Sequence, residues 1–210
     1  MNRRARPLML AAMACLAGAM SGPAFRAHAA EPQAAAMAPL CAPHSEVRIC
    51  YPPNQYPHLL LPGGAEEIVR SMLHIAKPMH FGDFVWNDEH VPPGSVWVRI
   101  DLGRQLLSVF RGGHEIGSSV ILFGTDGKPT PTGSFSILEK NADYHSRTYD
   151  APMPYMLRLT KDGVAIHGSF VREGWATHGC IGVPLEFARL LFSAANKGDP
   201  VVIIPARPQG

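Results

Sequence analysis

The stretch AIHGSFVREGWATHGCIGVP, from Ala165 to Pro184, contains two His-Gly pairs, and Cys180 follows the second pair directly. His167 precedes the second histidine, His178, by eleven positions. A thiol is an effective nucleophile only as the thiolate, which requires a neighbouring base or a lowered pKa. A cysteine beside two histidines is compatible with a nucleophile, a metal ligand or a structural cysteine. Other features of the sequence must separate these three interpretations.

The N-terminus has the pattern of a secretory signal. MNRRARP is a basic n-region, the apolar run LMLAAMACLAGAM is too short to span a bilayer, and small residues follow around Ala27, Ala29 and Ala30. We therefore expect a signal peptide over residues 1–30 and an exported, periplasmic protein. No later segment is apolar for long enough to cross a membrane, so we do not expect an integral membrane protein.

The charge of the chain depends on this N-terminal segment. The segment contains four arginines and no acidic residue, so its removal lowers 19 basic residues to 15 against 17 acidic ones. The formal charge then changes from +2 to −2. This balance lacks the basic surface that nucleic-acid binding requires, and we expect no nucleic-acid partner. The remaining chain of about 180 residues suits one domain with an N-terminal extension.

Three cysteines remain once the signal is removed. Cys41 and Cys50 are separated by eight residues in a Pro-rich segment, and an oxidising compartment favours a disulfide between them that leaves Cys180 free. This pairing rests on the odd number of cysteines, and a bridge from either one to Cys180 stays open. His167, His178 and Cys180 are also valid zinc ligands, but no fourth ligand lies nearby in the sequence, so we expect no metal.

Residues 31–94 form an extension rich in Ala and Pro before the main domain. Within it, GAEEIVRSMLHIAKPM has apolar residues at helical spacing, which predicts a short helix that ends at Pro78. The residues that give this spacing are Ile68, Val69, Met72, Leu73 and Ile75.

Residues 95–205 have the alternation of β-strands, and residues 206–210 form a short tail. SVWVRIDL alternates Val96, Val98 and Ile100 with larger or charged residues, and QLLSVF, HEIGSSVILFG, GSFSILEK, YMLRLT, VAIHG and PVVIIP follow as further strands. PLEFARLLFSAAN, directly after the Cys180 segment, is amphipathic and predicts a helix. The expected fold class is mostly β, an antiparallel sheet with a helix after the cysteine, preceded by the Pro-rich arm and the short helix.

Several ordered motifs resemble the L,D-transpeptidase catalytic domain of the YkuD type. The hallmark of that family is a His, a variable gap and then Ser/Thr-His-Gly-Cys, which IHG…THGCIGVP matches. DLGRQLLSVFRGGHEI is similar to the opening hairpin of the family, KPTPTGSFSI to its TPTG strand entry and MPYMLRL to its substrate-side strand. The resemblance covers roughly residues 96–204 and implies a sandwich-like β fold.

The resemblance also implies a catalytic role for each residue of the motif. Cys180 would be the nucleophile, and His167 the general base that activates it. The backbone carbonyl of Gly168 would orient the imidazole. The N–H groups around Gly179 and Cys180 would stabilise the oxyanion. No cofactor is implied.

Other residues would bind the substrate or shape the site. Thr177 and His178 match motif positions beside the nucleophile, and Tyr155 would line the donor cleft. The segment 169–176 is similar to a short lid, on which Arg172 and Trp175 would contact the substrate. The family usually has Arg or Asn two residues after the nucleophile, whereas this chain has Gly182. Arg158 and Arg172 are candidate replacements for the missing cation.

The function that the resemblance implies is peptidoglycan L,D-transpeptidation. Cys180 would attack the carbonyl of the L-centred third residue of a tetrapeptide stem, release D-alanine and pass the acyl group to an acceptor amine, giving a 3→3 cross-link. Two other classes stay open, a hydrolase that trims stem peptides and a catalytically silent wall-binding module. A papain-like peptidase is disfavoured because in those enzymes the cysteine precedes the histidine.

Overall fold

The computed structural model describes residues 40–41, 46–60, 66–125 and 127–206. The predicted signal peptide, residues 1–30, lies outside the described residues, as does most of the predicted tail. Across the described ranges, no helix is both long and apolar enough to cross a membrane. The elements, in chain order, are β1 Arg48–Cys50, β2 His58–Leu60, β3 Glu66–Ile68, β4 Ser71–Leu73, β5 Phe84–Trp86, β6 Val96–Asp101, β7 Leu106–Arg111, β8 His114–Val120, β9 Gly133–Ser136, β10 Glu139–Ser146, β11 Ala151–Arg158, β12 Ala165–Gly168, β13 Ile181–Val183, α1 Leu185–Ala194 and β14 Pro200–Ile204.

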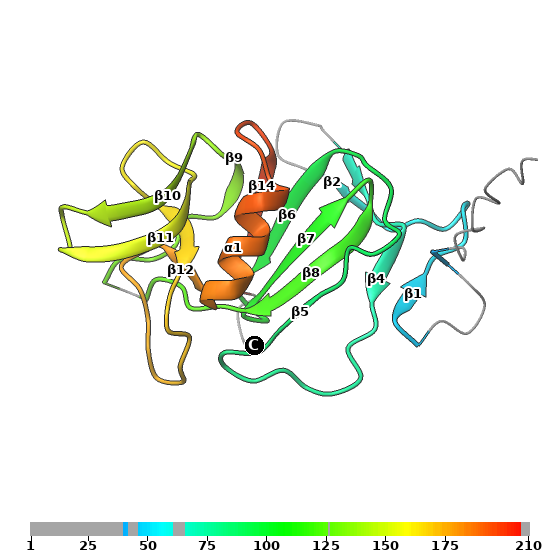
Figure 1. Cartoon of the computed structure of the whole chain (residues 1–210), viewed down its shortest axis with the longest axis horizontal. Helices are drawn as coiled ribbons and strands as arrows, with labels where there is room; N and C mark the ends of the chain where they lie inside the picture. Colours follow the sequence, from blue (N-terminus) through cyan, green and yellow to red (C-terminus); the bar gives the residue numbers. More distant parts are fainter. Residues whose placement is uncertain (1–39, 42–45, 61–65, 126, 207–210) are drawn as a thin grey trace, which may run out of the picture. The chain divides into compact units, whose positions relative to one another are not determined.

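Most strands belong to two sheets (Figure 1). The larger sheet has the order β1-β4-β8-β7-β6-β14-β9, and β5 pairs with β8 beside this path. Its neighbours are antiparallel except for the β4–β8 and β6–β14 pairs. The smaller sheet has the order β10-β11-β12-β13, and a third, two-stranded sheet pairs β2 with β3. The prediction of a mostly β fold is confirmed.

The core lies where α1 packs between these two sheets (Figure 1). Phe187, Ala188 and Leu191 form the buried stripe of the helix. They join a cluster that includes Val98 and Ile100 of β6, the residues whose alternation predicted this strand. The helix begins directly after β13, as the sequence predicted, and it is the only helix among the described residues. Its position fixes the end of the strand that follows Cys180.

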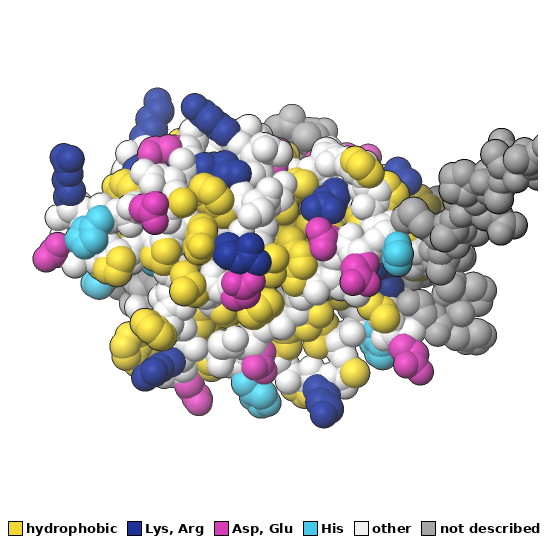
Figure 2. Space-filling model, viewed as in Figure 1, with side chains coloured by type: hydrophobic (Ala, Val, Ile, Leu, Met, Phe, Trp, Pro, Cys, Tyr) yellow, Lys and Arg dark blue, Asp and Glu magenta, His cyan; other side chains and the backbone are white. Residues whose placement is uncertain are grey.

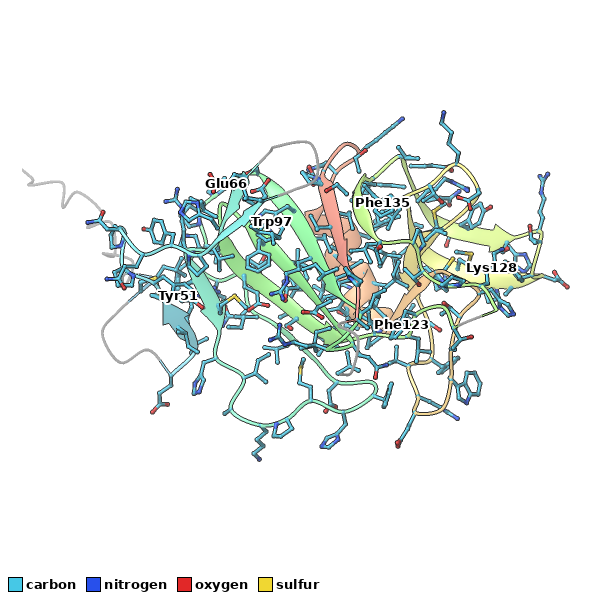
Figure 3. The ribbon with its side chains drawn as sticks, turned by 180° about the vertical axis from the view of Figure 1, so that it is seen from behind. Tyr51, Glu66, Trp97, Phe123, Lys128 and Phe135 are labelled. Atoms are coloured by element: carbon cyan, nitrogen blue, oxygen red, sulfur yellow. A yellow bond between two sulfur atoms is a disulfide. The ribbon has the colours of Figure 1, made fainter. Side chains whose placement is uncertain are left out.

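The face of β6 opposite the helix is buried as well. Trp97 is only 1% exposed and stacks on Phe110 of β7, with ring centroids 4.1 Å apart (Figure 3). The simple alternation of buried and exposed residues that the sequence suggested therefore does not hold for this strand. On the surface shown in Figure 2, basic and acidic side chains are interspersed, in line with the nearly balanced charge of the sequence.

The predicted short helix before Pro78 is wrong, because this segment forms β3 and β4 instead. Its backbone groups bond to other strands and not to one another: Arg70 N–H donates to the Gly113 carbonyl at 2.7 Å, and β4 pairs with both β1 and β8. The apolar residues of the segment suit both periodicities, and β-branched Ile68 and Val69 favour strands. Pairing with the edge of a sheet therefore outweighs the helical spacing.

A buried polar network joins this part of the chain to β8. Arg48 on β1 is 4% exposed, and its guanidinium donates to the carbonyls of Glu115 and Asn87 at 2.5 and 2.9 Å. The Glu115 carboxylate accepts the Leu73 amide of β4 at 2.8 Å. Burial raises the pKa of Glu115, against the opposing effects of its hydrogen bonds and of Arg48. Residues before 95 therefore contribute buried contacts to the large sheet.

Candidate active site

The segments that contain the two His-Gly pairs come together because β12, which includes His167 and Gly168, is a parallel neighbour of β13, which begins directly after Cys180. Their register sets Ile166 opposite Ile181 and His167 opposite Gly182. Alternation along β12 places Ala165 and His167 on one face, and Cys180 packs against Ala165 in a small cluster. The structure therefore brings the predicted nucleophile and the predicted base to the same face of the small sheet.

The imidazole of His167 is held by its own neighbour. Its Nδ1 donates to the carbonyl of Gly168 at 3.0 Å, which leaves Nε2 with a free lone pair. Burial lowers the pKa of His167, and the Gly168 contact only partly offsets this effect. Burial therefore favours the neutral imidazole, and the Gly168 contact favours the tautomer with its proton on Nδ1.

The thiol of Cys180 is half-buried among apolar side chains. The described residues that pack around it include Met153, Met156 and Ala165. Its Sγ donates to the carbonyl of Gly163, at a distance of 3.7 Å. Burial raises the pKa of Cys180, and the Ala165 backbone hydrogen bond, followed by the nearby Lys128 and Arg158 charges, opposes that shift. The resting thiol is protonated at neutral pH.

The THGC loop is held in place by two threonine hydroxyls. Thr177 Oγ1 donates to the Cys180 carbonyl at 2.5 Å. Thr130 Oγ1 donates to the Gly179 carbonyl and accepts the Gly124 amide, both at 2.9 Å. Gly179 has φ of +103°, which only glycine adopts without strain. Thr130 belongs to the TPTG motif, so this contact explains why that motif accompanies the cysteine loop.

Close approach of two loops requires glycine at position 124. A Cβ built on Gly124 would lie 2.2 Å from the Lys128 carbonyl and 2.7 Å from the Gly179 Cα. No side chain fits at these distances. The turn that leads into TPTG therefore packs directly on the loop that presents Cys180.

His178 stacks on a tyrosine that the sequence did not point to. Its ring lies 4.8 Å from that of Tyr149, with an interplanar angle of 20°. Lys128 Nζ lies 2.5 Å from the Tyr149 hydroxyl and 5.1 Å from the ring centroid. Sequence reasoning missed Tyr149, because it lies in the turn between β10 and β11, outside every recognised motif.

Tyr155 does not join this group. Its φ of +56° is a left-handed conformation that few residues with side chains adopt, and its ring lies 5.8 Å from that of Phe192 on α1. Tyr155 packs against the main core, whereas Cys180 packs against the separate cluster of Met153 and Met156. The contacts of Tyr155 within the described residues are packing contacts, and its role in the donor cleft stays a prediction.

The predicted lid is a loop with exposed aromatic side chains. Phe170 is 76% exposed and Trp175 is 59% exposed. The guanidinium of Arg172 lies 5.8 Å from the first ring and 6.0 Å from the second. A cavity of about 460 Å³ lies between this loop and the residues Gly168 and Leu185. Arg172 and Trp175 are thus on the surface beside the strand that bears His167.

Gly182 lies at the centre of the site, opposite His167. A Cβ built there would lie 3.0 Å from the Ser169 Cβ and 3.5 Å from the Leu122 Cβ. Ser169, which lies two residues after His167 and on the same face, therefore occupies part of the space that a side chain at position 182 would need. The backbone N–H of Gly182 donates to the Leu122 carbonyl, and the Leu122 N–H donates to the Gly182 carbonyl, both at 2.9 Å.

The predicted pairing of the cysteines is found in the structure. Cys41 and Cys50 form a disulfide, and Cys180 is the free cysteine in the part of the chain that the structure describes. Within those same ranges, no cluster of three or more His, Cys, Asp or Glu side chains has the arrangement of a metal site.

Comparisons with known proteins found matches to one family of catalytic domains. The family model of the L,D-transpeptidase catalytic domain matches residues 95–203. L,D-transpeptidase 1 of Mycobacterium tuberculosis is 28% identical over 120 residues, which cover 49% of this chain and 48% of that protein. The chain thus spans about half the length of this curated relative. The solved L,D-transpeptidase from Stackebrandtia nassauensis shares the fold with a TM-score of 0.51 and 24% identity, over 59% of this chain and 63% of that chain.

Proposed function

Because this chain belongs to the L,D-transpeptidase catalytic-domain family, we propose that it is a peptidoglycan L,D-transpeptidase with Cys180 as nucleophile and His167 as general base. The observation that supports this best is the placement of both side chains on one face of the β12–β13 pair, with the imidazole oriented by the Gly168 carbonyl. This arrangement suits a cysteine acyl transfer.

The first half-reaction forms a thioester. Sγ of Cys180 attacks the carbonyl carbon of the L-centred third residue of a tetrapeptide stem, and the thiol proton passes to Nε2 of His167. Backbone N–H groups around Gly179 and Cys180 stabilise the oxyanion of the tetrahedral intermediate. Its collapse breaks the peptide bond, and the amine of the leaving D-alanine takes the proton from the imidazolium.

The second half-reaction transfers the acyl group. An amine of a neighbouring stem attacks the thioester carbonyl and gives its proton to His167. The carbon–sulfur bond then breaks, and the thiolate of Cys180 recovers the proton. The products are a 3→3 cross-linked dimer and the free enzyme. No cofactor takes part in this sequence.

The acid–base properties of the site favour a proton transfer that accompanies attack. Burial raises the pKa of Cys180 and lowers that of His167, so the resting pair is neutral and not a thiolate–imidazolium pair. The imidazole becomes charged only as the sulfur–carbon bond forms, which is the behaviour of a general base. The thiol must first turn from the Gly163 carbonyl towards His167.

We further propose that the chain is exported and acts in the periplasm, associated with the cell wall. The signal-like sequence of residues 1–30 and the Cys41–Cys50 disulfide support this, since disulfides persist in oxidising compartments. The peptidoglycan stems then serve as donor tetrapeptide and acceptor amine.

The test incubates the mature protein with disaccharide-tetrapeptide muropeptides and follows the products by mass spectrometry. We expect loss of D-alanine together with a cross-linked dimer, both abolished in Cys180→Ala and slowed about 10²–10⁴-fold in His167→Ala. A tripeptide monomer without dimer would identify a hydrolase. Muropeptide that is bound but not converted would identify a wall-binding module, and either result would overturn the proposal.

A further inference from the structure

Two cations lie close enough to Cys180 to act on its thiol, and they differ in how they are paired. Lys128 and Arg158 both favour the thiolate. Arg158 Nε is bound to the Glu139 carboxylate at 2.8 Å, and the guanidinium also lies over the Tyr144 ring. Its charge is therefore already neutralised. Arg158, which the sequence suggested as a substitute for the cation missing at position 182, is not free to bind a substrate.

Lys128 has a different environment. Among the described residues, no carboxylate lies within ion-pair distance of its Nζ, which contacts the hydroxyl and the ring of Tyr149. Arg172, the other suggested substitute, lies over Phe170 and Trp175 of the exposed lid. Of the two cations near the thiol, Lys128 (labelled in Figure 3) is thus the one without a direct ion pair in the described ranges. The negative charge of Asp162 nevertheless acts on both Lys128 and Cys180.

The position of Lys128 is tied to the nucleophile loop at two points. Its backbone carbonyl lies 3.6 Å from the point where a Cβ of Gly179 would be. Its side chain rests on Tyr149, which stacks on His178. Three separate segments, the turn before TPTG, the β10–β11 turn and the THGC loop, therefore meet around Lys128. The contact with Tyr149 raises the pKa of Lys128, so the group is charged at all physiological pH values.

We propose that Lys128, supported by Tyr149, is the carboxylate anchor of this site and binds a carboxylate of the stem peptide beside the scissile bond. It takes over a task for which position 182 has no side chain. This inference rests on the proposed function and names the chemistry by which that site selects its donor. The carboxylate is either the terminal one of the leaving D-residue or a side-chain one on the third residue.

Binding measurements separate these two sources. In a Cys180→Ala background, NMR titrations follow a tetrapeptide, its C-terminal amide and its third-residue side-chain amide, with and without Lys128→Ala. We expect the Lys128→Ala change to weaken the free tetrapeptide about five-fold, as a solvent-exposed ion pair allows. It should weaken the amide that lacks the bound carboxylate less than about two-fold. The difference should shrink as salt is raised.

Two further variants separate charge from fold. Lys128→Arg retains the cation and should retain most of the preference for the carboxylate. Lys197→Ala removes an exposed lysine from the turn after α1 and should change no affinity. Equal weakening of all three peptides, no weakening of any, or no binding of any peptide would overturn the anchor.

Turnover of the protein with Cys180 intact keeps this test distinct from that of the function. Cross-linking by the wild type that Lys128→Ala leaves unchanged in KM would refute the anchor and leave the transpeptidase standing. Carboxylate-selective binding that depends on Lys128, without turnover by the wild type, would support the anchor and refute the transpeptidase.

Discussion

Replacing Gly182 with Ala tests whether glycine at this position is required by packing. The added Cβ would lie 3.0 Å from the Ser169 Cβ and 3.3 Å from its Oγ, closer than carbon atoms approach without repulsion. Gly182 is buried and pairs with backbone on both sides, with Leu122 and with His167, so the strand has little room to shift. We expect an overpacking cost of about 1–3 kcal/mol in the free energy of unfolding.

Urea unfolding of four proteins measures this cost: the wild type, Gly182→Ala, Ser169→Gly and the double variant. Because Ser169→Gly removes the atoms that the added methyl group would meet, the double variant should recover about 1 kcal/mol or more of coupling free energy. Gly127→Ala is the matched control, since a Cβ there has open space and no strained φ, and it should be neutral or slightly stabilising. A Gly182→Ala variant as stable as Gly127→Ala would refute the packing argument.

Three further predictions concern the disulfide, the threonine that holds the THGC loop and the thiol. Replacing Cys41 and Cys50 with Ser should cost about 2–3 kcal/mol for a loop of this length, or roughly 5–10 °C in Tm. Calorimetry checks the loss, and a changed rate of Cys180 acylation in the folded variant would contradict a purely structural role. Thr130→Val should cost about 1–3 kcal/mol for each polar group left unpaired and slow acylation, because the Gly179 carbonyl loses its hydrogen bond; urea unfolding and single-turnover kinetics measure the two effects. Because burial raises the pKa of Cys180 and only the thiolate reacts, the rate of its alkylation by iodoacetamide should still increase at pH values above the pKa of an ordinary thiol. A rate that is already constant at neutral pH would indicate a preformed thiolate–imidazolium pair.

The sequence predicted the strands of the main sheet and helix α1 because the buried apolar residues of these segments follow one clear period. Val98 and Ile100 alternate towards the core, and Phe187 and Leu191 recur at helical spacing. The segment before Pro78 was mispredicted because Ile68, Val69, Met72 and Leu73 suit a helix or a strand equally well. The partners that decide between them are other strands, β2 for β3 and both β1 and β8 for β4, and a local pattern does not reveal such pairing.

The site was predicted to the extent that motifs describe it. His167 of IHG and Cys180 of THGC lie on the same face of the small sheet, and their catalytic roles stay a prediction. Tyr155 stays a predicted wall of the donor cleft; its left-handed φ and its contact with Phe192 of α1 are features that periodicity does not report. Tyr149 had no signal at all, since its role arises only when the β10–β11 turn folds back onto His178. Contacts of this kind depend on tertiary structure and not on neighbours in the chain.

The family model begins at residue 95, but a strand before that residue also supports the position of the site. Phe84 and Trp86 of β5 pack edge-on against Phe187, with ring centroids 5.7 and 5.6 Å away. Phe187 is fully buried in α1, and α1 starts immediately after the strand that follows Cys180. The aromatic contacts of β5 therefore help to fix the helix on which the position of β13 depends. The boundary at residue 94 divides the sequence by composition, while the packing that supports the nucleophile continues across it.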